Sequence, residues 1–239
     1  MINKHLLIFI LLFCSITQSV AQHNGKNFSV SLGVDYTTSA QIFLNPNSSD
    51  IVLRNKSFEI EHLTSPIIDI RYRLTDDIIL GLSSEYISKS KKGRNFSALE
   101  GSQVVELLVE DGIEFIPIEL SVYYQMPFST EDFKFNMGAG GGYYVGKQTR
   151  IFGDTEIEKL YSEDNFSILV SIGMEYLFLK NLSLRFDMKF RDPELKLKNK
   201  YLKDHVLYEG NIINLSNDEF YSKINLNGIS FLFGLALQL

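Results

Sequence analysis

Apolar and polar side chains alternate one by one along eight segments of the chain. Between Phe28 and Thr37, apolar residues at even positions alternate with small or polar residues at odd positions. Because successive side chains of a β-strand point to opposite faces, this pattern predicts a strand with one apolar and one polar surface. No segment keeps the helical spacing for three turns. Seven further segments share the alternation: residues 68–74, 80–86, 116–124, 133–145, 166–176, 182–191 and 229–239.

The apolar faces of these eight segments carry no charged side chain and consist mainly of large residues. The interior of an eight-stranded barrel is just wide enough for side chains to fill, so these faces fit only on its outer surface, against lipid. The sequence therefore predicts an all-β fold, an eight-stranded antiparallel up-and-down transmembrane β-barrel with long outer loops; ten strands are the alternative. The expected connections alternate in length as in such barrels: residues 75–77, 125–132 and 179–181 are short, and 38–64, 88–113, 147–164 and 192–222 are long.

Aromatic residues gather at the ends of the predicted strands, where membrane barrels carry girdles of aromatic side chains. Phe28, Tyr72, Tyr124, Phe133 and Tyr176 fall on the side of the short turns, and Tyr36, Tyr86, Tyr143, Phe166 and Phe190 on the side of the long loops.

The first 21 residues have the features of a secretory signal peptide. Lys4 precedes an apolar stretch, Leu6 to Phe13, and Ser19-Val20-Ala21 supplies a small-x-small cleavage site. We therefore expect residues 1–21 to be removed and residues 22–239 to form the barrel domain. Cleavage removes Cys14, the one cysteine of the 239-residue chain, so neither disulfides nor thiolate metal sites are expected. The acidic balance, 29 Asp and Glu against 23 Lys and Arg, argues against nucleic acid as a partner.

Taken together, the mature chain resembles the small outer-membrane barrels of the OmpA and OmpX type, and among them the PorT-like outer-membrane β-barrel domain family. The resemblance rests on the strand architecture and on the terminal strand Gly228 to Leu239. This strand is similar to the C-terminal signal that the barrel-assembly machinery reads, although Leu239 stands where that signal normally has an aromatic residue. The resemblance implies a location in the bacterial outer membrane, in contact with lipid and lipopolysaccharide.

The polar faces of the predicted strands carry twelve charged residues into the lumen, six acidic and six basic. Unpaired charges in a narrow interior are heavily penalised by desolvation, so we expect these groups to pair and to fill the barrel. A narrow gated pore for small ions or solutes is the alternative. The expected lumen charge network consists of Asp35, Asp69, Arg71, Arg73, Glu85, Glu119, Lys134, Glu175, Arg185, Asp187, Lys189 and Arg191.

The long loops carry further features. A basic stretch begins the second long loop and is a candidate for contact with lipopolysaccharide phosphates. Two apolar stretches, 51–60 and 104–109, are expected to continue strands into protruding hairpins, where exposed apolar residues would suit a protein partner. The glycines from Gly138 to Gly142 have the wrong spacing for a phosphate-binding loop. The basic stretch consists of Lys89, Lys91, Lys92 and Arg94.

No constellation in the sequence indicates catalysis, a cofactor or a metal site. His62 and Ser65 are close in sequence, but no paired nucleophile and base stands out. We therefore expect a non-enzymatic barrel without a wide channel, acting as a structural or partner-binding component of the envelope, for instance as a subunit of a secretion or assembly complex. A lipid-modifying enzyme and a secreted lipocalin-like carrier are the remaining alternatives.

Overall fold

The computed structural model describes residues 27–100, 103–163, 165–215 and 219–239. The predicted signal peptide lies outside these residues. The described part is almost entirely β-structure, with one five-residue helix. Its elements are β1 (Phe28–Phe43), α2 (Ile51–Asn55), β2 (Ser57–Arg73), β3 (Ile78–Glu85), β4 (Ile87–Glu100), β5 (Gln103–Gln125), β6 (Phe133–Phe152), β7 (Thr155–Ser162), β8 (Phe166–Leu179), β9 (Leu182–Arg191), β10 (Glu194–Tyr201), β11 (His205–Tyr208), β12 (Asn211–Asn214), β13 (Glu219–Asn225) and β14 (Ile229–Gln238).

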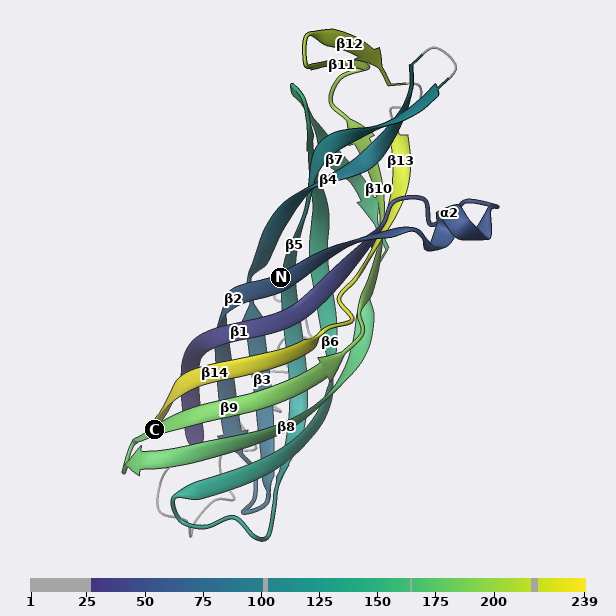
Figure 1. The fold of residues 1–239 in the computed structure, drawn as a ribbon. Coiled ribbons are helices and arrows are strands. Elements are labelled where there is room, and N and C mark those ends of the chain that lie inside the picture. Colours follow the sequence, from purple (N-terminus) through teal and green to yellow (C-terminus); the bar gives the residue numbers. More distant parts are fainter. Residues whose placement is uncertain (1–26, 101–102, 164, 216–218) are drawn as a thin grey trace, which may run out of the picture.

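Eight of the strands pair antiparallel in a series that returns to its first member. The order is β1, β2, β3, β5, β6, β8, β9, β14 and then β1 again. These strands are strongly tilted and wind around a common interior (Figure 1). We call this part the lower ring; it runs from the short turns at the lower end of Figure 1 up to the paired residues Ile116 and Val145. Each of the eight predicted segments contributes one strand to it.

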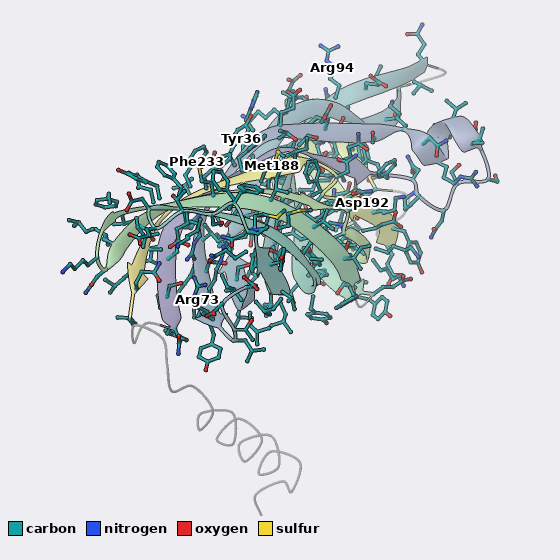
Figure 2. The ribbon with its side chains drawn as sticks, turned by 90° about the horizontal axis from the view of Figure 1, so that it is seen from below. Tyr36, Arg73, Arg94, Met188, Asp192 and Phe233 are labelled. Carbon is teal, nitrogen blue, oxygen red and sulfur yellow. The ribbon has the colours of Figure 1, made fainter. Side chains whose placement is uncertain are left out.

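Strand β5 shows how the lower ring divides its side chains. From Ile116 to Tyr124 the even-numbered residues are large, apolar and 45–63% exposed, whereas Glu119, Ser121 and Tyr123 point inward and are at most 4% exposed. The same division holds around the ring, and Figure 2 shows side chains such as Phe233 pointing away from the interior. The predicted alternation of an apolar outer and a polar inner face is therefore confirmed.

Above the lower ring the distribution of side chains is inverted. Farther along β5, the outward positions become polar at Glu114 and Glu110, while Phe115, Ile113 and Val109 point inward and are buried. Strands β4, β7, β10 and β13 join the upper parts of β1, β2, β5 and β6 here, and we call this part the upper extension. Its interior is mainly apolar and its surface mainly polar, as in a water-exposed domain.

The number of strands differs from the prediction. The described residues contain fourteen strands, against the eight expected and the alternative of ten. The six additional strands, β4, β7, β10, β11, β12 and β13, lie in segments expected to be long outer loops. The prediction recognised strands by an alternation that turns large apolar side chains outward, toward lipid. The six additional strands were missed because this pattern is absent where the apolar side chains point inward.

One of the two expected strand extensions is also corrected in part. Residues 104–109 do lie in β5, but Ile51–Asn55 form the helix α2, and β2 begins only at Ser57. The carboxylate of Asp50 accepts a hydrogen bond from the Val52 N–H at 2.8 Å, which caps the first turn of the helix. In the described part of the chain, no helix is long and apolar enough to cross a membrane.

Candidate functional site

The interior of the lower ring contains most of the charged residues singled out in the sequence. Ten of the twelve are at most 7% exposed, and they form a lower and an upper cluster. Arg73 and Lys134 lie instead at the lower mouth of the ring, where they are half-buried. The ten buried residues are Asp35, Asp69, Arg71, Glu85, Glu119, Glu175, Arg185, Asp187, Lys189 and Arg191.

The lower cluster joins two arginines to three carboxylates. Arg71 on β2 donates from Nε to Asp69 at 2.9 Å and from NH2 to Asp187 on β9. Arg185 on β9 donates to Asp69 and, at 3.0 Å, to Glu175 on β8. In the ring, β1 and β14 separate β2 from β9. Asp69, which accepts from both arginines, therefore ties separate parts of the wall together.

The upper cluster spans the ring more widely. The NH1 atom of Arg191 on β9 lies 2.6 Å from both Glu85 on β3 and Glu119 on β5. Lys189 donates to the second oxygen of Glu119 at 3.0 Å, and Asp35 on β1 lies 3.5 Å from Arg191. In ring order, β3 and β9 are four strands apart in either direction, so Arg191 connects opposite walls.

Two inward tyrosines complete these clusters, and the sequence interpretation missed them. The guanidinium carbon of Arg71 lies 4.0 Å from the centre of the Tyr123 ring, and the Tyr144 hydroxyl donates to Glu119 at 3.0 Å. Each tyrosine is adjacent in sequence to one of the expected girdle residues, Tyr124 and Tyr143. The alternation that placed those two outward would have placed Tyr123 and Tyr144 inward.

An apolar layer lies directly above the upper cluster. Tyr144 belongs to both, because its ring packs in the layer while its hydroxyl binds Glu119. The layer fills most of the interior at the base of the upper extension with apolar side chains, although the buried polar residues Gln148 and Ser222 pair with its members Ile113 and Leu197. Its members are Ala40, Ile42, Ile60, Leu63, Ile87, Ile113, Phe115, Tyr144, Leu195, Leu197, Ile224 and Leu226.

A further buried ion pair lies within the upper extension, apart from the two clusters. Arg150 on β6 donates to the two oxygens of Asp111 on β5 at 2.7 and 3.2 Å, and to the Tyr201 hydroxyl at 3.1 Å. Burial alone would lower the pKa of Arg150, but the Asp111 carboxylate and the Tyr201 hydroxyl together outweigh burial and raise it. The sequence interpretation missed this pair because both residues fall in segments expected to be loops.

The basic stretch expected to contact lipopolysaccharide lies on β4 and is exposed. Lys89 and Lys91 donate to backbone carbonyl oxygens of β2 at 3.2 and 3.3 Å, where β2 and β4 lie side by side. Among the described residues, Lys92 and Arg94 have no ion-pair partner. Two of the four basic groups thus help to hold the wall of the upper extension together.

His62 and Ser65 do not come together. Ser65 points inward, is 3% exposed and donates to Glu85 at 2.5 Å. His62 is exposed, and its Nδ1 lies 2.6 Å from the Tyr36 hydroxyl. The backbone of His62 has a φ of 58°, and the buried positions of β2 change from even to odd between Ile60 and Leu63. The two side chains therefore form no nucleophile and base pair.

The first prediction concerns the cross-ring ion pairs. Replacing Arg191→Met leaves the carboxylates of Glu85, Glu119 and Asp35 without their shared cation, so we expect a loss of about 3–5 kcal/mol in the free energy of unfolding. Lys196→Met removes the exposed ion pair with Glu163 and should cost at most about 1 kcal/mol. Urea unfolding in lipid vesicles, followed by circular dichroism, measures both. Equal costs for the two variants would contradict the stabilising role of the upper cluster.

The second prediction concerns the effect of acid on the contacts of Asp154. The Asp154 carboxylate, next to the positive-φ turn residue Gly153, pairs with Lys203 and accepts the Leu207 N–H at 2.8 Å, which joins the β6–β7 turn to the β11–β12 hairpin. These two contacts hold the pKa of Asp154 below its ordinary value of 3.8. A lowered pKa stabilises the contact above about pH 4, and this stabilisation is lost as the pH falls through the folded-state value.

Hydrogen exchange of the Leu207 amide should therefore accelerate below about pH 4 beyond its intrinsic dependence. A second exposed carboxylate, Asp204, also has a pKa below its ordinary value, because His205 donates a hydrogen bond to it. The control is the variant Asp154→Asn. It should remove the acid-dependent acceleration of exchange at the Leu207 amide and leave the titration of Asp204 unchanged. An unchanged acid profile in this variant would refute the assignment.

Comparisons with known proteins point to one fold. No protein-family model matches the sequence, and no curated protein is significantly similar to it. The outer membrane protein OprG from Pseudomonas aeruginosa superposes with a TM-score of 0.62 at 13% identity, over 91% of this chain and 97% of OprG. The outer membrane protein AlkL in lipid bilayers superposes with a TM-score of 0.52 at 12% identity, over 92% and 93%. The chain has the fold of the small outer-membrane β-barrel proteins that its sequence resembles.

Proposed function

We propose that this protein is an integral outer-membrane β-barrel without an open wide channel, which acts as a structural or partner-binding component of the bacterial envelope. One observation carries the proposal: the lower ring combines an apolar outer belt with an interior filled by paired charges. In this proposal the eight ring strands form an up-and-down barrel that spans the membrane.

The apolar outer belt supports contact between the lower ring and lipid. Soluble monomers rarely expose apolar patches larger than a few hundred Å², yet the lower ring exposes large apolar side chains on all eight strands. On β5 and β6 the belt ends where Ile116 and Val145 are followed by the outward ion pair of Glu114 and Lys147, at 3.2 Å. A tilted strand needs about 9–11 residues to cross the hydrocarbon core, which matches the apolar stretch of β5.

The interior argues against a wide channel. Aqueous channels need about 16–18 strands, whereas the ring has eight, and its two charged clusters lie below a cluster of buried apolar side chains. A narrow pore would need a path through the charged clusters and through the apolar side chains above them. A lipocalin-like carrier would need an apolar ligand cavity, but the interior of the lower ring is charged.

The upper extension is the part proposed to meet partners. It exposes Val104, Leu202, Leu207 and Ile212, each more than half exposed, at or near the tips of outer hairpins. Lys92 and Arg94 remain candidates for lipopolysaccharide phosphates. In the lower ring, the terminal strand Gly228 to Leu239 is the proposed signal for the barrel-assembly machinery, and a larger outer-membrane complex is the proposed setting.

Arginine substitutions at two heights along β5 test where the membrane belt lies. Leu120 and Leu108 both point outward on this strand, 63% and 46% exposed, but only Leu120 lies in the belt. Leu120→Arg should cost about 2–4 kcal/mol in lipid vesicles, and Leu108→Arg at most about 1 kcal/mol. Urea unfolding from vesicles gives both values. A tolerated arginine at position 120 would contradict the proposed span.

Conductance tests the filled interior. The purified protein in planar bilayers should show little or no steady current, because ion pairs and the apolar layer occupy the lumen. Large stable channels would overturn this part of the proposal. Small gated openings that disappear in a variant of the upper cluster would favour the narrow pore instead.

A further inference from the structure

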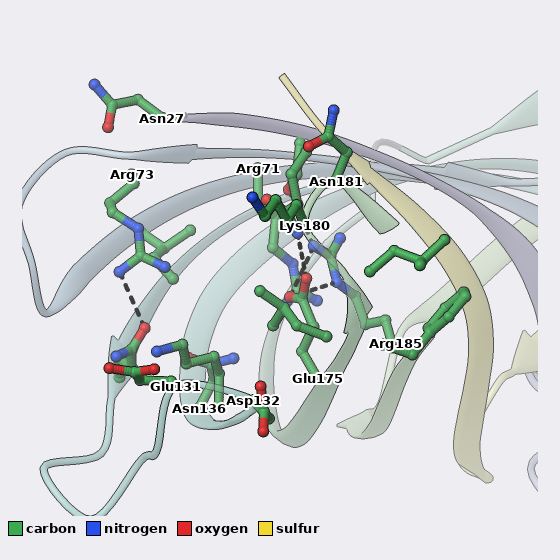
Figure 3. Close-up of a pocket in the computed structure, with 18 residues that line it drawn as sticks. Asn27, Arg71, Arg73, Glu131, Asp132, Asn136, Glu175, Lys180, Asn181 and Arg185 are labelled. Atoms are coloured by element: carbon green, nitrogen blue, oxygen red, sulfur yellow. Dashed lines mark hydrogen bonds and ion pairs between the residues drawn. The ribbon is translucent and has the colours of Figure 1, made fainter. Parts of the chain in front are cut away.

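A cavity of about 1060 Å³ lies at the lower mouth of the ring, beneath the lower charged cluster. We call it the vestibule. Arg71, Arg185 and Glu175 form its inner end, and the turn around Lys180 and Asn181 lies at its rim (Figure 3). Its inner charges are used in the ion pairs already described, so any ligand must be recognised by the groups nearer the mouth.

Apart from Lys180 at the rim and the arginines of the lower cluster, two cations line the vestibule from different walls. Lys134 lies on β6 and has no ion-pair partner among the described residues. Arg73 lies on β2 and donates from NH1 to the Asp76 carbonyl at 2.8 Å and to Gln125 Oε1 at 3.0 Å (Figure 3). Both contacts use NH1, and the Arg73 side chain lines the cavity. Because β3 and β5 separate the two strands, the cations act as a clamp rather than as neighbours on one strand.

The remaining polar groups of the vestibule limit the kind of ligand that it can bind. Asn136, on the same face of β6 as Lys134, is 4% exposed and lines the vestibule, and its Oδ1 has no hydrogen-bond partner. Glu131 and Asp132 are exposed at the rim. Two cations inside and a carbonyl acceptor beside them suit an anionic group with an adjacent N–H donor. The rim, with Glu131 and Asp132 against Lys180, has an acidic excess that disfavours further negative charge outside.

From this arrangement we infer that the vestibule binds the C-terminal carboxylate of an extended peptide that enters from the side of the short turns. Lys134 and Arg73 hold the carboxylate by charge-assisted hydrogen bonds, and Asn136 accepts the N–H of the last residue. The vestibule is large enough for several residues. Only the compartment that supplies the peptide, the periplasm, rests on the proposed function.

The test uses the whole mature chain, residues 22–239, folded in detergent micelles. Binding of a fluorescent Ala-Ala-Ala peptide with a free carboxylate is measured by anisotropy, beside the same peptide with an amidated C-terminus and inorganic phosphate as a competitor. We expect saturable binding of the free carboxylate and none of the amide. Lys134→Gln and Arg73→Gln should each raise the Kd about tenfold or more, since each removes a charge-assisted hydrogen bond to the carboxylate.

The matched control is Lys92→Gln, the same change on the exposed outer face of β4, which should leave the Kd unchanged. Circular dichroism and the gel mobility of the unboiled protein verify that each variant folds. If phosphate alone binds with the same sensitivity to Lys134→Gln, the anion clamp stands and its source is a phosphate group. Absence of binding by the unmodified chain, equal binding of the amidated peptide, or an unchanged Kd in Lys134→Gln would overturn the inference.

This outcome is separable from that of the proposed function. Micelle binding depends on the vestibule alone, whereas the arginine substitutions on β5 test the apolar belt. A failure of either leaves the other measurement intact.

Discussion

Charges inside a ring with an apolar surface must find partners inside that ring, and the rest of this structure depends on this constraint. The inward faces of the eight strands bring six buried carboxylates and four buried cations into one narrow space. A buried charge without a partner costs several kcal/mol, so the strands must be placed where the guanidinium groups can reach the carboxylates. Arg191 reaches Glu85 and Asp35 on other strands, and Asp69 accepts from two arginines. The pairing thus fixes the interior as well as filling it.

The polarity of the wall changes sign along its length, and this division gives the two parts of the molecule different environments. Below Ile116 the outward side chains are apolar and the inward ones polar; above it, Glu114 and Lys147 begin a polar surface around an apolar interior. The same strands, β5 and β6, run through both parts without a break. One continuous sheet can therefore satisfy lipid at one end and water at the other, because in both parts each side chain has an environment that suits it.

The same reasoning explains which parts of the site could be predicted from the sequence. Residues of the charged clusters alternate with large apolar residues, so their inward direction followed from the period of two, and the structure places ten of the twelve together. Tyr123 and Tyr144 obeyed the same rule but were overlooked beside Tyr124 and Tyr143. Asp111 and Arg150 could not be paired from the sequence, because their strands lack a lipid-facing pattern and their contact joins residues 39 positions apart.

The sequence by itself determined the eight ring strands and the direction of their side chains, because alternation is a local property that each strand carries in its own residues. It also determined that the lumen would be charged. Only the tertiary structure decided which charge meets which, how the strands continue above the belt, and that Arg73 and Lys134 stand apart from the clusters at the edge of a cavity. Those outcomes depend on the tilt and stagger of strands that are distant in sequence, which no single segment encodes.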